Sequence, residues 1–182
     1  MMKKVAFSAL LIVVILILFS FFRSTAQNPL KVGDKIPSFQ LKDQSGDNFD
    51  IDQYIGNTAM VIYFYPKDDT PGCTKEACSF RDAYEAFTDK NIKVIGISSD
   101  DVESHKNFAA KYNLPFTLLA DTQSEVRGLF GVKDNAFGLI PGRVTYVIDK
   151  KGEIIFMYDS QLKAAKHIEE SIKAIDAAIK DE

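Results

Sequence analysis

The chain has 182 residues, of which 46% are hydrophobic and 26% are charged, and its formal net charge is −3. This length suits one domain with a substantial core, and the acidic balance excludes the basic surface that nucleic acid or anionic lipid would require. With two cysteines, two histidines and no Gly-rich phosphate loop, we expect no metal ion, flavin or nucleotide cofactor.

The first 26 residues are expected to form a targeting or membrane segment. Residues 5–22 form an uncharged apolar run, and Lys3 and Lys4 precede it. This pattern is typical of a secretory signal with a cleavage site after Ala26, yet the run is also long enough for a membrane anchor. We therefore expect residues 1–26 to direct the rest of the chain out of the cytoplasm, to the periplasm or another extracytoplasmic site, with 5–22 as a potential anchor.

After a linker and lead-in at 27–37, a single domain is expected at 38–182. Its elements, in chain order, are a hairpin of 38–41 and 48–51, a strand at 59–65, a helix at 70–89, a strand at 93–98, a helix at 102–112, a strand at 116–119, a helix at 124–130, a hairpin of 143–149 and 154–158, and a helix at 162–179. Strands that alternate with helices before a terminal hairpin predict an α/β domain with a mixed sheet between helix layers.

Two of these helices carry periodic aromatic side chains. In the helix at 70–89, Ala77, Phe80, Tyr84 and Phe87 recur at spacings of three and four, which marks a buried face. We interpret these aromatic side chains as core residues rather than a binding site.

In the helix at 102–112, Phe108 and Tyr112 are expected to point inward. The two histidines, His105 and His167, each lie in a charged stretch. We therefore expect both imidazoles at the surface.

The two cysteines lie where a buried strand changes into a helix. The β-branched and aromatic run at 61–65 predicts the strand, and Thr70 followed by Pro71 is a helix-start signature. Cys73 then falls in the first helical turn. There the free N–H groups and the positive end of the helix dipole favour the thiolate.

Other interpretations of the cysteine pair are an inert structural disulfide or two buried thiols that only pack. Cys73 and Cys78 are five residues apart, which on a regular helix separates their Cα atoms by about 8–9 Å. A disulfide needs about 4.4–6.8 Å, so the geometry disfavours a permanent bridge. The spacing also fits a zinc site poorly.

The segment resembles the peroxiredoxin active site, Pro-x-x-x-Thr-x-x-Cys, with Pro66, Thr70 and Cys73 in the matching positions. The second cysteine, Cys78, is similar to that of the bacterioferritin comigratory protein, or peroxiredoxin Q, branch. The likeness extends from about Leu30 to the C-terminus, and it implies a thioredoxin-like fold of the peroxiredoxin type.

The resemblance also implies an activity, that of a thiol-dependent peroxidase for hydrogen peroxide and organic hydroperoxides. Cys73 would attack the peroxide and become a sulfenic acid, and Cys78 would then form a disulfide with it. A thioredoxin-like dithiol would reduce that disulfide. We expect a monomer that touches a membrane only through its N-terminal segment.

Four further residues receive roles from the resemblance. The hydroxyl of Thr70 would bind the peroxide, and backbone N–H groups near Gly72 would add donors. Arg143 matches the family's arginine beside the thiolate, and Pro66 would shield Cys73 from water.

Two of these roles have a plainer alternative. Thr70 caps the helix in any case. Arg143 alone would be interpreted as a solvated cation at a strand end. The nearby Glu76 is interpreted as an acid placed by the helix dipole, with no catalytic part.

Two other functions remain open from the residues. One is an exported thiol–disulfide oxidoreductase, although four residues, rather than two, separate the cysteines. The other is a redox-sensing domain attached to a membrane partner.

Overall fold

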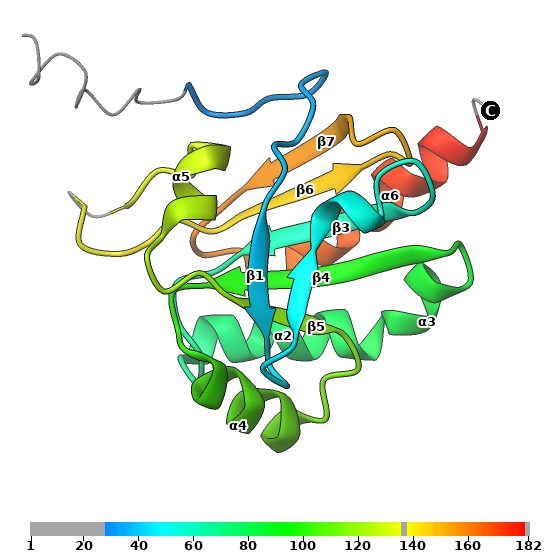
Figure 1. The fold of residues 1–182 in the computed structure, drawn as a ribbon. Helices are drawn as coiled ribbons and strands as arrows, with labels where there is room; N and C mark the ends of the chain where they lie inside the picture. The colour runs from blue at the N-terminus through cyan, green and yellow to red at the C-terminus, as the bar shows by residue number, and fades with distance from the viewer. Residues whose placement is uncertain (1–27, 136–137, 181–182) are drawn as a thin grey trace, which may run out of the picture.

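A computed structural model describes residues 28–135 and 138–180, which are built around one seven-stranded mixed sheet (Figure 1). The strands run β2-β1-β5-β4-β3-β6-β7 across the sheet. Their bounds are β1 Gln40–Asp43, β2 Asn48–Asp50, β3 Ala59–Phe64, β4 Ile92–Ser98, β5 Thr117–Ala120, β6 Val144–Ile148 and β7 Ile154–Asp159. β3, β4 and β5 are parallel, and β6 joins β3 in the antiparallel sense. Both predicted hairpins and all three predicted central strands are confirmed.

The helices are α2 Pro71–Asp82, α3 Tyr84–Thr88, α4 Val102–Tyr112, α5 Glu125–Phe130 and α6 Ala164–Lys180, with a short 3-10 helix, η1, at Ile51–Gln53. The single helix predicted at 70–89 is wrong in one respect, because it is two helices. Ala83, with φ −101° and ψ 12°, leaves the helical conformation between them. The apolar positions of the 70–89 segment keep helical spacing across this break, so periodicity does not reveal the break.

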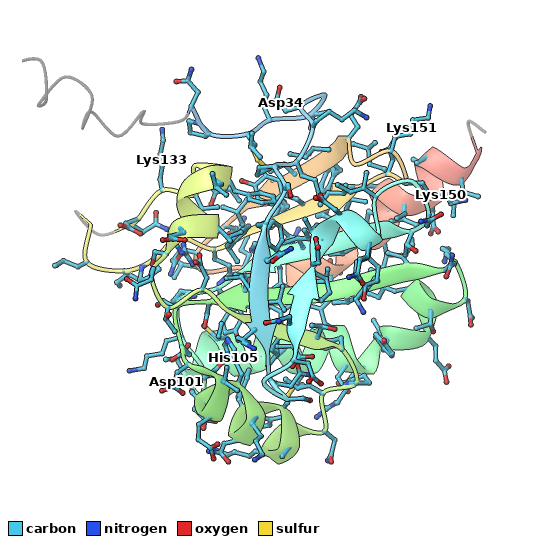
Figure 2. All side chains as sticks on the ribbon, viewed as in Figure 1. Asp34, Asp101, His105, Lys133, Lys150 and Lys151 are labelled. Carbon is cyan, nitrogen blue, oxygen red and sulfur yellow. The ribbon has the colours of Figure 1, made fainter. Side chains whose placement is uncertain are left out.

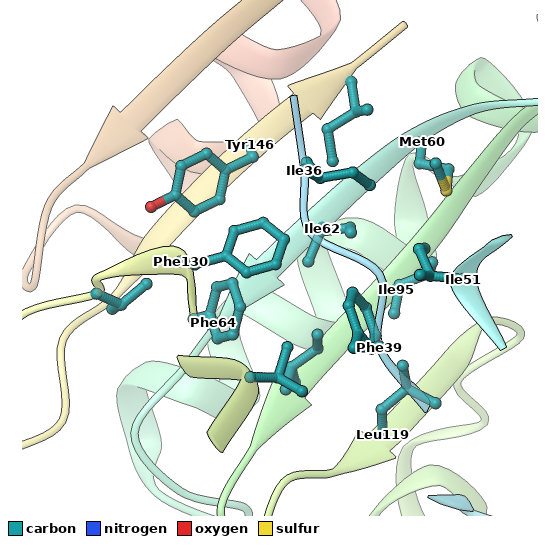
Figure 3. Packing of buried hydrophobic residues seen from close by; sticks show 14 of the residues in the cluster. Ile36, Phe39, Ile51, Met60, Ile62, Phe64, Ile95, Leu119, Phe130 and Tyr146 are labelled. Carbon is teal, nitrogen blue, oxygen red and sulfur yellow. The ribbon is translucent and has the colours of Figure 1, made fainter. Parts of the chain in front are cut away.

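Alternate side chains of β3 enter opposite layers of the core. On one face, β3 packs beneath residues 36–39, η1 and α5 (Figure 3). The apolar side chains labelled there are Ile36, Phe39, Ile51, Met60, Ile62, Phe64, Ile95, Leu119, Phe130 and Tyr146. On the other face, Val61, Tyr63 and Tyr65 pack against α2, α3, α4 and α6. The expected thioredoxin-like fold, a mixed sheet between helix layers, is confirmed.

The predicted buried face of the 70–89 segment is also present. Ala77, Phe80 and Phe87 are at most 1% exposed, whereas Tyr84 is half-buried. These side chains place α2 firmly on the sheet, and α2 carries both cysteines.

Both histidine predictions are wrong. His105 and His167 are completely buried. His105 lies three residues before Phe108 on α4, and His167 lies three residues after the buried Ala164 on α6. Each imidazole therefore shares the inward face of an amphipathic helix, although its sequence neighbours are charged.

The segment before residue 38 contacts the domain, because the N–H of Leu30 donates to the carbonyl of Phe130 and that of Ile36 to the carbonyl of Gly152. The expected leader at 1–26 lies outside the described residues. Among residues 28–135 and 138–180, no helix is long and apolar enough to cross a bilayer. The proposed domain limits stay a prediction.

Candidate active site

The turn that follows β3 brings the chain into α2. Asp69 has a positive φ of 56°, and Thr70 is the N-cap residue, with Pro71 as the first residue of α2. The helix start is therefore where the sequence predicts it. The predicted capping bond of Thr70 is wrong, however: its hydroxyl instead donates to the carbonyl of Lys67 at 3.0 Å. With its proton engaged there, the Thr70 oxygen keeps lone pairs that can accept a hydrogen bond.

Cys73 is the third residue of α2 and is only 1% exposed. The N–H groups of Gly72 and Cys73 belong to the first helical turn, which has no preceding carbonyl to pair them within the helix. Cys78 lies on the same helix and is half-buried, and both cysteines are free thiols. Cys73 is therefore placed for nucleophilic chemistry and Cys78 for a later step.

Arg143 lies immediately before β6 and is 2% exposed. Its Nη2 donates to the Sγ of Cys73 at 3.2 Å, and its Nε donates to the carbonyl of Gln161 at 3.3 Å. A Cβ on Gly72 would lie 3.2 Å from that same Nη2, so the missing side chain at Gly72 lets the guanidinium reach the start of α2. The structure thus brings together three residues that the sequence singled out.

Glu76 is an unexpected member of this site. It is fully buried, and Arg143 Nη1 donates to its Oε2. Its second oxygen, Oε1, has no hydrogen-bond partner and lies 3.6 Å from Nδ1 of His167. Burial raises the pKa of Glu76 to about 8, and the charge and hydrogen bond of Arg143 oppose that rise.

His167 lies beside Oε1 of Glu76. Its Nε2 lies 2.9 Å from the carbonyl of Ser160, which requires a proton on that nitrogen, and Thr145 Oγ1 lies 2.8 Å from Nδ1. The Thr145 hydroxyl therefore donates to a neutral imidazole. Burial lowers the pKa of His167 to about 4, against the opposing effect of the Ser160 carbonyl.

A second arginine that the sequence interpretation missed supports the site. Arg127, on α5, is 6% exposed, and its guanidinium donates to the carbonyls of Tyr65 and Gly142, each at 3.1 Å. Tyr65 precedes the turn that leads to Cys73, and Gly142 precedes Arg143. Arg127 therefore holds together the two backbone segments that supply the thiol and its neighbouring cation. No motif around Arg127 marks it in the sequence.

Pro66 is half-buried and begins the turn from β3, two residues before the buried carboxylate of Asp68.

Within residues 28–135 and 138–180, no group of three or more histidine, cysteine, aspartate or glutamate side chains is arranged to hold a metal ion. The chemistry of the site rests on a buried thiol, an adjacent guanidinium and a helix N-terminus. Those features suit attack by sulfur on an electrophile that leaves as an anion.

The chain matches known proteins over most of its length. Residues 32–157 match the model of the AhpC/TSA family. Peroxiredoxin Q, chloroplastic, of Populus jackii is 50% identical over 145 residues, which cover 80% of this chain and 68% of the relative.

Solved structures agree with this relationship. Peroxiredoxin Q of Xylella fastidiosa, as a cysteine-to-serine mutant, has a TM-score of 0.77 and 29% identity, covering 84% of this chain and 99% of that one. The bacterioferritin comigratory protein of Xanthomonas campestris, whose structures address alkyl peroxide reduction, has a TM-score of 0.71 and 29% identity, with 80% and 99% coverage.

Proposed function

The chain belongs to the AhpC/TSA family, in its peroxiredoxin Q branch, and from this premise we propose how its residues carry out the reaction of a thiol peroxidase of that type. The observation that carries the proposal is the contact of Arg143 Nη2 with Cys73 Sγ at the start of α2. A fixed cation and a helix N-terminus act on the same sulfur. Both favour the thiolate, which is the form that attacks peroxides.

In the oxidation step, the Cys73 thiolate attacks one peroxide oxygen and the O–O bond breaks. Cys73 becomes a sulfenic acid, and the other oxygen leaves as hydroxide or alkoxide and takes up a proton. Arg143 stabilises the negative charge on that leaving oxygen. Thr70 accepts a hydrogen bond from the peroxide, while the N–H groups of Gly72 and Cys73 donate to it, and Pro66 limits access of water.

In the resolving step, the thiol of Cys78 attacks the sulfur of the sulfenic acid. A Cys73–Cys78 disulfide forms and water leaves. A thioredoxin-like dithiol then reduces the disulfide and is itself oxidised, which returns both cysteines to thiols. Peroxiredoxin Q relatives and the alkyl peroxide activity named for the Xanthomonas protein support hydrogen peroxide and organic hydroperoxides as substrates. The reaction uses no cofactor, and the functional unit is a monomer.

Replacement of each cysteine by serine tests these roles. With purified residues 27–182, Cys73→Ser should abolish peroxide consumption, whereas Cys78→Ser should consume one equivalent and stop at the sulfenic acid. Mass spectrometry after trapping with dimedone should show a sulfenic acid on Cys73 in Cys78→Ser and no such product in Cys73→Ser. Full loss of the first turnover in Cys78→Ser would contradict the assignment, and insulin reduction without peroxide would instead favour a thiol–disulfide oxidoreductase.

Export of the domain is a separate proposal, supported by Lys3, Lys4 and the apolar run at 5–22. A reporter enzyme that is active only outside the cytoplasm, fused after residue 182, should be active. N-terminal sequencing then decides between a chain that begins at Gln27 and an uncut anchor. A cytoplasmic product that retains Met1 would overturn this proposal and leave the peroxidase chemistry unaffected.

A further inference from the structure

The turn at 67–70 carries Thr70 and leads to Cys73, and three side chains of α4 contact this turn. Two of them, His105 and Ser104, bind Asp68, with 2.9 Å between Oδ2 and Nδ1 of His105 and 2.8 Å between Oδ2 and the hydroxyl of Ser104. The third contact is exposed, between Asp69 and Lys111 at 2.8 Å. None of these contacts involves a residue that the reaction described above uses.

Asp68 is a carboxylate with three donors around it. Its Oδ1 accepts from the hydroxyl of Tyr65 at 2.7 Å, and its Oδ2 accepts from the hydroxyl of Ser104 at 2.8 Å as well as from His105. Burial raises the pKa of Tyr65 well above its usual value, and the nearby Tyr63 and Asp68 raise it further, so this hydroxyl keeps its proton and remains a donor. Asp68 itself is only 6% exposed.

His105 has an oxygen acceptor at each ring nitrogen. Nδ1 faces the Asp68 carboxylate, and Nε2 lies 3.1 Å from the carbonyl of Leu119. The carbonyl of Leu119 requires a hydrogen on Nε2, and one hydrogen joins Nδ1 to Oδ2 of Asp68. Figure 2 shows His105 on α4, close to Asp101 at the start of that helix. A buried pair with all its donors and acceptors used has one favoured geometry, and removal of one partner leaves the other buried without that hydrogen bond.

We propose that His105 is a positioning residue for the oxidation of Cys73, because it fixes Asp68 and thereby the turn that places Thr70. The backbone supports the same placement, since the N–H of Asp68 donates to Oδ2 of Asp100 at 2.9 Å. Thr70 is two residues further along, and its hydroxyl is oriented by the carbonyl of Lys67, inside the same turn. A shift of Asp68 therefore moves both the Thr70 oxygen and the carbonyl that orients it. This inference rests on the proposed function of Cys73 and Thr70.

The exposed contact supplies a matched control. The side chains of Asp69 and Lys111 are 48% and 56% exposed, so solvent screens their attraction. Lys111→Ala should therefore leave the rate of Cys73 oxidation unchanged. It removes a tie between the same turn and the same helix without touching the buried pair.

Two substitutions of His105 separate its two hydrogen bonds. Asparagine has its amide nitrogen near the place of Nδ1, so His105→Asn retains a donor toward Asp68 and loses the bond to Leu119. Glutamine has its amide nitrogen near the place of Nε2, so His105→Gln retains the bond to Leu119 and leaves Asp68 without that donor. Both remove the imidazole ring and a comparable amount of packing, and urea unfolding compares their stabilities.

The test measures single-turnover oxidation of Cys73 by hydrogen peroxide in the wild type and the three variants. His105→Gln should slow oxidation by about tenfold or more, because a misplaced substrate-binding group is costly, and His105→Asn should recover most of that rate. Hydrogen exchange should show faster exchange of the amides of Asp68 and Thr74, which donate to Asp100 and to the carbonyl of Thr70, in His105→Gln, with β3 unchanged.

Equal rates in both His105 variants, at equal stability, would overturn the inference, as would wild-type oxidation in a folded His105→Gln. If only His105→Gln fails to fold, the rate of His105→Asn against that of Ser104→Ala decides. Ser104→Ala removes a different donor from Asp68, so a loss of rate at unchanged stability supports control through Asp68, and an unchanged rate opposes it. An inactive wild type would instead be a failure of the proposed function.

Discussion

Arg143 joins Cys73 and Glu76 through two different nitrogens of one guanidinium, Nη2 to Sγ at 3.2 Å and Nη1 to Oε2. One buried cation thus has two acidic neighbours, and a negative charge on Glu76 weakens the attraction that Arg143 exerts on Cys73 or on a leaving oxygen. Because burial raises the pKa of Glu76 to about 8, with Arg143 opposing the rise, this carboxyl is mostly protonated at neutral pH. The charge of Arg143 is then available for the reaction.

Ionisation of Glu76 should therefore slow the oxidation of Cys73. In the wild type, the second-order rate constant should fall by about threefold as pH rises through about 8, since less of the field of Arg143 reaches the leaving oxygen. Glu76→Gln should remove that fall. Because the chain has no tryptophan, competition with a haem peroxidase for hydrogen peroxide is a suitable assay. Glu85→Gln, an exposed substitution on α3, is the control, and a parallel fall in all three proteins would assign it to another group.

Stability should depend on Glu76 in a defined direction. Its pKa is about 8 in the folded state against an ordinary 4.5, so between these values the folded state holds a proton that the unfolded state has lost. The contribution of Glu76 to the free energy of unfolding is then complete below pH 4.5, and it decreases as pH rises toward 8. From pH 6.5 to 8 this fall should be about 2 kcal/mol by urea unfolding. Glu76→Gln should reduce the fall, and an identical pH dependence in the variant would show that the carboxyl is not the titrating group.

His167 should act in the opposite direction at lower pH. Its pKa is about 4 in the folded state against an ordinary 6.5, so below 6.5 the unfolded state takes up a proton first and stability falls as pH falls. Glu76 opposes this in the wild type. In Glu76→Gln the effect should be visible, as a loss of about 2–3 kcal/mol from pH 6.5 to 4.5. Addition of His167→Asn should flatten that slope, and an unaltered slope would exclude His167 as its source.

The sequence predicts this site unevenly, for physical reasons. Local rules are sufficient for the β3 run and for the Thr70-Pro71 start of α2, because each depends on neighbouring residues. The contact of Arg143 with Cys73 joins residues 70 positions apart, and only the family resemblance anticipated it. Glu76 and Arg127 were missed because buried charged side chains are defined by partners that are distant in the chain.

The histidines illustrate how charge alone misleads. His105 lies among polar neighbours, yet its spacing of three from Phe108 places it on the buried face of α4. Its buried partner is Asp68, which is 37 residues away, and no pattern within α4 indicates that partner. Helical spacing would have been the better guide to its exposure.

Thr70 should contribute through its hydroxyl oxygen. That hydroxyl donates to the carbonyl of Lys67 and leaves the oxygen to accept from a peroxide. Thr70→Val removes the acceptor while it keeps the shape, and should slow Cys73 oxidation by about tenfold to a hundredfold. Thr70→Ser retains the hydroxyl and should stay close to the wild-type rate. The same peroxidase competition assay measures both, and a wild-type rate in Thr70→Val would remove Thr70 from the reaction.

Formation of the Cys73–Cys78 disulfide should require α2 to unwind locally. Residues five apart on a regular helix have Cα atoms about 8–9 Å apart, beyond the range of a disulfide. Glu76 lies between the two cysteines, so the unwinding must also withdraw its buried carboxyl from Arg143. Further along, Phe87 remains anchored in the core, which should confine the change to residues 70–80.

Hydrogen exchange compared between the reduced and disulfide forms tests this directly, because amides that lose their helical bonds exchange faster. Amides of residues 74–80, which donate within the helix, should lose protection on oxidation, whereas those of β3 should keep it. Cys78→Ser, oxidised to the sulfenic acid, is the control: it cannot form the disulfide, so its α2 should retain the protection of the reduced protein. If α2 stays fully protected in a chain whose Cys73–Cys78 disulfide is proven by mass spectrometry, unwinding of this helix is not part of the resolving step.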